Sequence, residues 1–290
     1  MRRSMLFCPA NNPKLYSTAP LLKPDCIIFD LEDSVAIEEK DSARDLLVEA
    51  VKFYNYPANE AVPEIFVRIN ALHTPYASLD VEAVVSSGLS KIRLPMCESE
   101  ESILALDNLI SELEDKYKIP SGSIKIQAAI ETPKGVLNAE SIAKASERVI
   151  SLSFGAEDYT NCLGIHRLSE MPILDYARAH IALVCQAYGL DAIDTVWSDI
   201  ADTEGFIKES NKVLNMGFSG KSCVHPSQLE PLHKVFTPSS HEIEKALHLI
   251  EQFNRNNEDH SGVALIDGKM VDKPIIERHK NIKKELTHEN

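Results

Sequence analysis

Short apolar runs recur along the chain, and segments with helical periodicity separate most of them. Each run is four to six residues long and is followed by polar or turn-forming residues, a pattern typical of buried strands. The runs cover residues 4–8, 26–29, 65–69, 91–94, 126–130, 149–154, 192–197 and 221–224. Amphipathic helical patterns cover residues 38–53, 79–85, 98–116, 138–145, 172–187 and 203–215. The pattern therefore predicts about eight strand–helix repeats.

These strands are too apolar to have one face in water, which is typical of a parallel sheet covered by helices. A count of about eight favours a closed barrel over an open doubly wound sheet. No G-x-G-x-x-G follows any of the strands, which weakens a dinucleotide-binding interpretation. We therefore predict an α/β fold, a (β/α)8 TIM barrel, in a catalytic domain of residues 1–236.

The last part of the chain, residues 237–290, does not follow this repeat. It has a charged amphipathic helix at 239–253, a polar linker at 254–262 and a second helix at 275–286. Between them, Asp267-Gly268 separates two short apolar runs, which is a hairpin signal. We predict a C-terminal helix–hairpin–helix extension, an arm that covers the barrel mouth or embraces a neighbouring subunit.

Composition limits the class of protein. The net charge of −14 argues against nucleic acid as a partner, since a phosphate backbone requires a basic face. No segment approaches the roughly 20 apolar residues of a membrane span, and the apolar run before Pro9 is too short for a signal peptide. The six cysteines form no C-x-x-C pair, which favours a reduced chain with a cytoplasmic location.

Two carboxylates follow successive strands of the predicted barrel. Glu131 comes directly after residues 126–130, and Asp158 follows residues 149–154 and Gly155. If the strands are parallel neighbours, both side chains emerge at the same end, where Mg²⁺ typically takes one or two carboxylates and keeps several waters. The alternative is that Glu131 caps the next helix and Asp158 belongs to a loop turn. Their shared position at strand ends favours the metal.

Active sites of such barrels lie at the carboxyl ends of the strands. Arg68 ends the third strand and could hold a substrate carboxylate bidentately. Its alternative is an ion pair with Asp30, Glu32 or Asp33, and both can hold at once. For His225 we favour a hydrogen bond within its loop over an acid/base role. Further cations, which could meet phosphates or remain ordinary solvated side chains, are Lys14, Lys40 and Arg44.

Seven motifs occur together and in order: RSMLFCPAN at 3–11, FDLEDSVA at 29–36, VRIN at 67–70, AIETPKG at 129–135, FGAEDY at 154–159, MGFSGKSCVHP at 216–226 and GKMVDKP at 268–274. Over nearly its whole length the chain therefore resembles the citrate lyase β-subunit (CitE-like) family of acyl-CoA lyases, within the broader aldolase/citrate lyase group. The resemblance implies an enzyme, usually a homotrimer, that uses Mg²⁺ to cleave a carbon–carbon bond of a 3-hydroxy-acyl-CoA. Citryl-CoA, giving acetyl-CoA and oxaloacetate, is one such substrate, and malyl-, methylmalyl- and citramalyl-CoA are others.

The resemblance also implies roles for individual residues. Glu131 and Asp158 match the metal ligands, Arg68 the arginine that grips the keto-acid carboxylate, and Glu32 a carboxylate beside the metal waters. Asp272 matches an acid/base on the arm, which in relatives reaches into an adjacent subunit's site. The positions that match the CoA site are Lys14, Lys40, Arg44, Val224, His225 and Pro226.

Two positions depart from the family pattern. Ala10 stands where the family has the glycine of a Pro-Gly-Asn turn, and alanine disfavours positive φ. His225 before Pro226 resembles the stand-alone malyl- and citramalyl-CoA-type lyases. Two other functions stay open: a class II metal-dependent aldolase acting on free hydroxy-keto acids, and a non-catalytic assembly subunit whose partners are the other citrate lyase subunits.

Overall fold

The computed structural model describes residues 2–168, 171–256 and 263–277. They divide into two compact units, one of Arg2–Phe236 and one that begins at Thr237. Each unit is described by itself.

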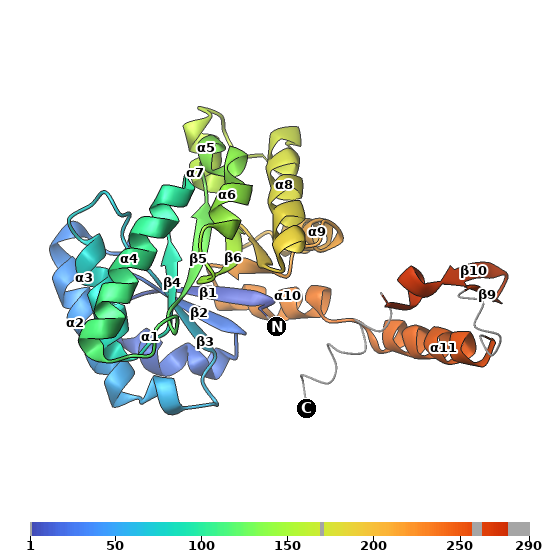
Figure 1. The fold of residues 1–290 in the computed structure, drawn as a ribbon, viewed down its shortest axis with the longest axis horizontal. Helices are drawn as coiled ribbons and strands as arrows, with labels where there is room; N and C mark the ends of the chain where they lie inside the picture. Colours follow the sequence, from blue (N-terminus) through green and yellow to red (C-terminus); the bar gives the residue numbers. More distant parts are fainter. Residues whose placement is uncertain (1, 169–170, 257–262, 278–290) are drawn as a thin grey trace. The chain divides into compact units, whose positions relative to one another are not determined.

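The first unit is a closed barrel of eight parallel strands in sequence order, in which β1 pairs with both β2 and β8 (Figure 1). The prediction of a (β/α)8 barrel is thereby confirmed. The strands are β1 (Ser4–Pro9), β2 (Cys26–Asp30), β3 (Glu64–Arg68), β4 (Lys91–Leu94), β5 (Lys125–Ile130), β6 (Val149–Phe154), β7 (Asp191–Asp194) and β8 (Gly220–Cys223).

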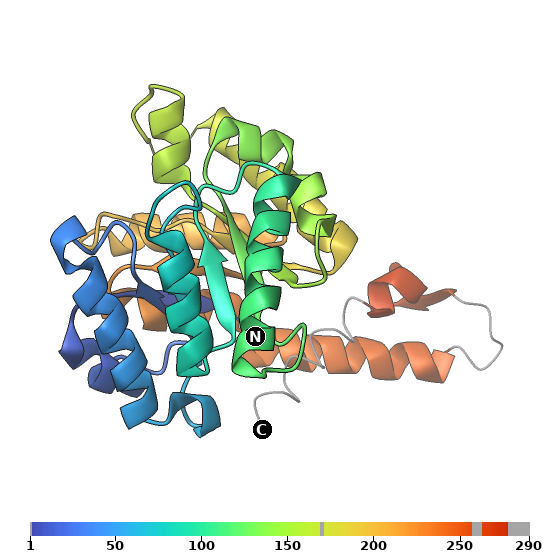
Figure 2. The ribbon, with the colours of Figure 1, turned by 60° about the vertical axis from the view of Figure 1, so that its left-hand side comes forward.

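Helices lie outside the strands, as the two views of the ribbon show (Figures 1 and 2). Their apolar faces pack on outward-facing strand residues in one continuous core, because alternate residues of a strand point to opposite faces. The helices are α1 (Pro13–Thr18), α2 (Lys40–Phe53), α3 (Ala77–Ser87), α4 (Glu100–Tyr117), α5 (Pro133–Leu137), α6 (Ala139–Lys144), α7 (Ala156–Cys162), α8 (Pro172–Tyr188), α9 (Thr203–Asn215) and α10 (Leu229–Phe236). Short 3-10 turns cover Pro20–Leu22, Ile37–Glu39, Tyr56–Ala58 and Pro226–Gln228.

A separate set of side chains forms a second buried cluster. Its five buried members come from β1, β2, β3 and β7: Met5, Cys26, Ile28, Phe66 and Ile193. Gln127 on β5 donates a hydrogen bond to the Met5 sulfur at 3.4 Å, so a polar layer begins directly beside this apolar cluster. The barrel interior is therefore filled, which is usual for eight strands.

The structure differs from the sequence prediction in two places. The seventh strand ends at Asp194 rather than at residue 197, because the following residues make loop contacts instead of ladder bonds. Thr195 Oγ1 accepts a hydrogen bond from the Ala156 amide, and the Trp197 carbonyl accepts one from Gln228. The short helices α1, α5, α7 and α10 were not predicted, since five to eight residues show too little periodicity.

The second unit contains α11 (Ser240–Asn256) and an antiparallel hairpin of β9 (Val263–Ile266) and β10 (Lys269–Asp272). Both residues of the Asp267-Gly268 turn have positive φ, which gives a two-residue turn its hairpin twist. Residues 273–277 are helical, and the remainder of the helix predicted at 275–286 lies outside the described residues, as do linker residues 257–262. A small apolar core joins α11 to the hairpin through Phe253, Ile266 and Val271.

The cysteine prediction can be compared with the structure directly. All six cysteines are free, and five of them are buried among apolar residues, where cysteine is a small hydrophobe.

Among the described helices, none has the length and apolar character needed to cross a membrane.

Candidate active site

A cavity of about 450 Å³ opens at the carboxyl ends of the barrel strands. All eight strands, or the residues directly after them, contribute to its lining. The lining residues are Phe7, Pro9, Asp30, Asp33, Ser34, Arg68, Arg93, Glu131, Phe154, Gly155, Glu157, Asp158, Thr195, Val196 and Val224.

Glu131 is the more buried of the two carboxylates predicted to bind the metal, with 5% of its surface exposed. Its Oε1 accepts a hydrogen bond of 2.5 Å from the Met96 amide, and within the described residues it has no ion-pair partner. Burial raises the pKa of Glu131 and the charge of Asp158 adds to this, whereas the Met96 hydrogen bond and the charges of Arg93 and Arg68 oppose it. Thr132, not Glu131, caps α5, because its hydroxyl accepts from the Gly135 amide. The helix-cap alternative for Glu131 is therefore wrong.

Asp158 lies in the first turn of α7 and is half-buried. Burial raises the pKa of Asp158, as do the charges of Asp33 and Glu157, while Arg68 opposes them. The turn that brings Asp158 to the cavity passes directly against Glu131, since a β-carbon on Gly155 would be 2.7 Å from Glu131 Oε2. The two predicted metal ligands therefore line one cavity.

Arg68 is held by the carboxylates of the loop after β2. Its Nε and Nη2 donate to the two oxygens of Asp30 at 2.7 and 2.8 Å, and its Nη1 lies 2.8 Å from Glu32 and 3.3 Å from Asp33. The guanidinium stacks over the Phe7 ring at 5.0 Å. The ion-pair alternative is what the structure shows, and the substrate-gripping role of Arg68 stays a prediction.

Glu32 pairs with this arginine and is close enough to Glu131 for their charges to interact. Burial raises the pKa of Glu32 to about 8; Arg68 opposes this, whereas Asp33, Glu131 and Asp30 add to it. Asp30 shapes the loop, accepting hydrogen bonds from the backbone amides of Glu32 and Ser34. The cavity lining has five carboxylates and two arginines, so its acid groups outnumber its cations.

The cations predicted to hold CoA have different surroundings. Lys14 is exposed on α1, but Lys40 and Arg44 are buried on α2. Lys40 donates to the carbonyls of Leu31 and Glu32, and Arg44 pairs with Asp80 at 3.0 Å. Both side chains thus have partners inside the protein and present no exposed charge to a phosphate. Their CoA role stays a prediction.

The loop after β8 is organised by its own side chains. His225 Nδ1 accepts from the Ser227 amide, and Gln228 accepts from the amides of Val224 and His225. This agrees with the loop hydrogen-bonding interpretation of His225. Val224 lines the cavity, and Pro226 begins the 3-10 turn Pro226–Gln228.

Ala10 causes no strain in the turn after β1. It is not among the described residues with positive φ, and its amide donates to the Asp30 carbonyl at 3.0 Å. Asp272 belongs to the other unit, at the end of β10, where its side chain accepts from the Ile275 amide. Its acid/base role stays a prediction.

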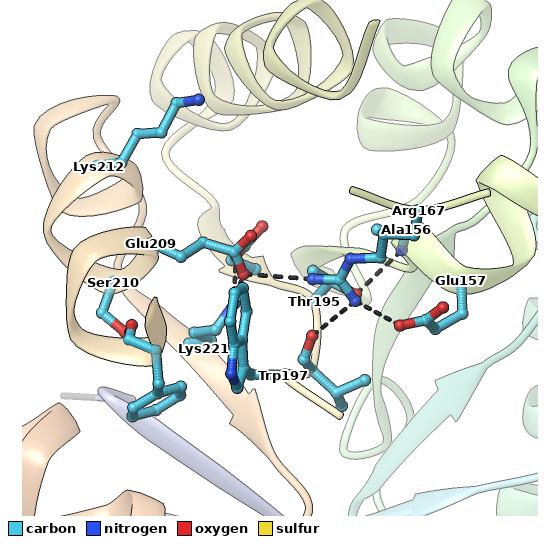
Figure 3. Close-up of polar contacts among 12 residues, drawn as sticks. Ala156, Glu157, Arg167, Thr195, Trp197, Glu209, Ser210, Lys212 and Lys221 are labelled. Carbon is cyan, nitrogen blue, oxygen red and sulfur yellow. Dashed lines mark hydrogen bonds and ion pairs between the residues drawn. The ribbon is translucent and has the colours of Figure 1, made fainter. Parts of the chain in front are cut away.

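Sequence reasoning missed Arg93 and Arg167. Arg93 is a charged residue inside the apolar fourth strand, and that position was the available signal. Arg167 follows α7 and donates to Glu157, a contact drawn in Figure 3, at 2.5 Å and to the Val196 carbonyl at 2.9 Å. Its Nη2 lies 3.3 Å from Glu209, so Arg167 connects the cavity rim to α9 (Figure 3).

Glu209 belongs to a buried cluster of four charges. Lys221 Nζ lies 2.6 Å from Asp194 and 2.7 Å from Glu209, and Arg178 pairs with the same two carboxylates at 2.8 and 3.0 Å. Two positive and two negative groups balance, and this cluster joins β7 and β8 to α8 and α9.

The acid groups of the cavity fit a hard cation. Within the described parts of the chain, no group of three or more His, Cys, Asp or Glu side chains is arranged to hold a metal. Two carboxylates with open positions for water and substrate are nevertheless the set that Mg²⁺ uses in many enzymes. Glu131 is buried and has no ion-pair partner in the part of the chain that the structure describes. The charge of Asp158 raises the pKa of Glu131, and the charge of Glu131 raises the pKa of Glu32. A divalent cation there would relieve that repulsion.

Comparison with known proteins identifies the family. The profile of the HpcH/HpaI aldolase/citrate lyase family matches residues 3–226. The chain belongs to this family. The expectation of a lyase enzyme and the resemblance noted from the motifs are thereby confirmed at the family level.

Relatives extend over nearly the whole chain. The citrate lyase subunit beta of Haemophilus influenzae is 41% identical and covers 97% of this chain and 95% of its own length. The mitochondrial citramalyl-CoA lyase of Rattus norvegicus is 29% identical over 97% of this chain and 85% of its own. Among solved structures, CitE of Mycobacterium tuberculosis in complex with magnesium, acetoacetate and coenzyme A is 28% identical, with a TM-score of 0.79 and 97% of each chain covered.

Proposed function

We propose that the chain is a Mg²⁺-dependent carbon–carbon lyase that cleaves a 3-hydroxy-acyl-CoA. Citryl-CoA, giving acetyl-CoA and oxaloacetate, is the first candidate, and the malyl-, methylmalyl- and citramalyl-CoA esters are its analogues. The observation that carries the proposal is the buried, unpaired Glu131 in one cavity with Asp158. The solved family member with magnesium, acetoacetate and coenzyme A supports both the metal and the thioester.

Glu131 and Asp158 would hold the metal. Bound Mg²⁺ acts as a Lewis acid on the hydroxyl and carboxylate oxygens of such substrates and lowers the pKa of the alcohol. Glu32, whose pKa is raised in part by the charge of Glu131, would accept hydrogen bonds from metal-bound water.

The remaining residues orient the substrate and move protons. Arg68 would fix the carboxylate next to the hydroxyl, which aligns the breaking bond. The hydroxyl gives its proton to solvent water as its oxygen forms the new carbonyl of the keto acid. The carbon–carbon bond breaks in the same step, and its electron pair becomes the enolate of acetyl-CoA. Asp272 then donates the proton that this carbon takes up, and in the reverse direction it removes that proton.

The CoA portion would meet Lys14 and the loop of Val224, His225 and Pro226. The homotrimer, with each site completed by a neighbouring subunit, and the cytoplasmic location are parts of the same proposal. So is the possibility of partner citrate lyase subunits, in which case an assembly role would accompany catalysis.

A second candidate function is a class II aldolase acting on free hydroxy-keto acids. The burial of Lys40 and Arg44 favours it, because two of the cations expected at the CoA phosphates are used inside the protein. A titration with CoA separates the two functions: saturable binding supports the thioester lyase, and no binding alongside cleavage of free acids supports the aldolase.

The decisive experiment uses the purified full chain and the four thioesters with Mg²⁺, following release of the keto acid. We expect cleavage of at least one thioester, and its loss in Glu131→Ala and Asp158→Ala. Calorimetric Mg²⁺ binding should be lost in the same two variants and kept in Asp45→Ala, which removes an exposed carboxylate on α2. Full activity of Glu131→Ala and Asp158→Ala in metal-free buffer would refute the proposal, and inactivity of the lone wild-type chain would favour the assembly role.

A further inference from the structure

Arg93 is a buried guanidinium that has no carboxylate partner among the residues that the structure describes. It lies on β4, has 4% of its surface exposed and lines the cavity. Its Nη1 donates to Gln127 at 3.2 Å and to Ser222 at 3.3 Å, and both of these partners are neutral. Its Nε is buried and has no hydrogen-bond partner.

The other buried arginines in the described residues all have a carboxylate. Arg44 pairs with Asp80 at 3.0 Å, Arg148 with Glu114 at 2.7 Å and Arg178 with Asp194 at 2.8 Å. A buried charge is costly unless it is paired, so an arginine that is kept without a partner points to an anion that arrives from outside. Burial and the charge of Arg68 lower the pKa of Arg93 to about 10, although the charges of Glu131, Asp30 and Glu32 oppose this shift. Arg93 is therefore positively charged at neutral pH.

Arg93 and Arg68 lie side by side in the barrel wall. They are partners in the β3–β4 register, and each stacks over the Phe7 ring at 5.0 Å. Arg68 already has Asp30, Glu32 and Asp33, whereas Arg93 has no ion pair within the described residues. The cavity therefore offers a second cation, next to the one predicted to orient the substrate.

Arg93 also reaches across the barrel, from β4 to Ser222 on β8, in the polar layer that contacts the apolar cluster through Gln127 and Met5. Ser153, on the same face of β6 as Ser151, is a further buried hydroxyl without a partner. A ligand group that enters this layer would meet donors without an acceptor.

We propose that Arg93 binds a second carboxylate of the substrate and thereby selects hydroxy-acyl thioesters that release a dicarboxylic keto acid. This inference rests on the proposed lyase function. Citryl-CoA carries a carboxymethyl group on its carbinol carbon, where citramalyl-CoA carries a methyl group. The two esters therefore differ by the group that Arg93 would bind.

The test compares these two esters with Mg²⁺ in wild type, Arg93→Met and Lys91→Met. Lys91 is a matched control because it lies on the same strand and face but pairs with Glu64. We expect Arg93→Met to lower kcat/KM for citryl-CoA by about 10- to 100-fold, the range for a lost hydrogen bond to a charged group. Turnover of citramalyl-CoA by Arg93→Met should stay within about threefold of wild type. Lys91→Met should leave kcat/KM for both esters unchanged. Equal losses on both esters, or no loss on either, would overturn the proposal.

A binding measurement keeps this inference separate from the proposed function. Calorimetry with Mg²⁺ should show tighter binding of oxaloacetate than of pyruvate to wild type, and Arg93→Met should remove that preference. If wild type cleaves neither ester, the lyase function fails, yet the oxaloacetate preference still decides the role of Arg93. Arg93→Lys retains the charge and should retain part of the preference, which covers the case in which Arg93→Met does not fold.

Discussion

Gly155 and Glu131 approach each other so closely that a β-carbon at position 155 would lie 2.6 Å from Glu131 Cβ. Real β-carbons do not make such contacts, so Gly155→Ala must displace Glu131 or the turn that leads to Asp158. We predict that Gly155→Ala weakens Mg²⁺ binding by tenfold or more, because metal ligation depends on ligand position. Calorimetry with Mg²⁺ measures this directly.

The control for this prediction is Gly189→Ala. That residue has a φ of +67° and open space around it, so alanine there introduces backbone strain far from the cavity. It should lower the melting temperature but leave Mg²⁺ affinity unchanged. Unchanged Mg²⁺ affinity in Gly155→Ala would show that Glu131 tolerates displacement or does not bind the metal.

The bidentate pair of Arg68 and Asp30 leads to a second prediction. Asp30→Asn should release Arg68 from its fixed orientation and weaken the hydrogen bonds that shape the loop at Glu32. We expect kcat/KM to fall by about 100-fold, as for loss of a positioned charged contact. The kcat/KM of Arg68→Lys should fall by a similar factor, since an ammonium cannot make the paired contact. Steady-state kinetics on the preferred thioester would check both, and a loss in only one variant would argue against a shared role.

Glu64 gives a prediction for acid stability. Burial alone would raise the pKa of Glu64, but the hydrogen bonds and charge of Arg2, together with Lys91, outweigh it and lower that pKa to about 2. Because the folded-state pKa is lower than the unfolded one, the contribution to stability is complete above about pH 4.5. It is lost as the pH falls towards 2.

The measurement is urea unfolding of wild type and Glu64→Gln between pH 2 and 7. The difference in unfolding free energy should be about 2 to 3 kcal/mol at neutral pH and should shrink towards pH 2. A difference that stays constant over this range would mean that packing, and not charge, holds Glu64 in place.

The buried charge cluster leads to a fourth prediction. Lys221→Met removes one of the two cations that Asp194 and Glu209 share, so that Asp194 keeps only Arg178 and Glu209 keeps Arg178 and the 3.3 Å contact with Arg167. We expect a loss of about 3 to 5 kcal/mol in unfolding free energy, typical of breaking a buried pair. Lys116→Met, which breaks the exposed pair with Glu82, should leave the unfolding free energy almost unchanged, because solvent screens that pair. Similar losses in both variants would contradict the role assigned to burial.

The sequence predicted the barrel and the location of the two carboxylates because both depend on local patterns. A buried strand that ends in Glu131, followed by a second strand and Asp158, requires only that parallel strands end at the same side. The end of the seventh strand was not predictable, since Thr195 and Trp197 look like strand residues and only their loop contacts to Ala156 and Gln228 show otherwise.

The cations were harder to predict because their surroundings are set by residues far away in sequence. Lys40 and Arg44 lie on an amphipathic helix, and nothing nearby shows that Arg44 meets Asp80. Arg93 was missed for a related reason. It lies in a strand that the sequence pattern indicates only as structural, and its partners Gln127 and Ser222 come from later strands. Which charges are satisfied inside the fold is a property of tertiary contacts, which spacing along the chain does not encode.

The cavity draws a residue from every one of the eight strands or the positions directly after them. No fragment of the chain can therefore assemble the pocket, and the last strand must join the first before its wall is continuous. Binding of a small ligand in this cavity would therefore require the closed barrel. The rate at which ligand binding appears during refolding would measure the rate of the final step of assembly.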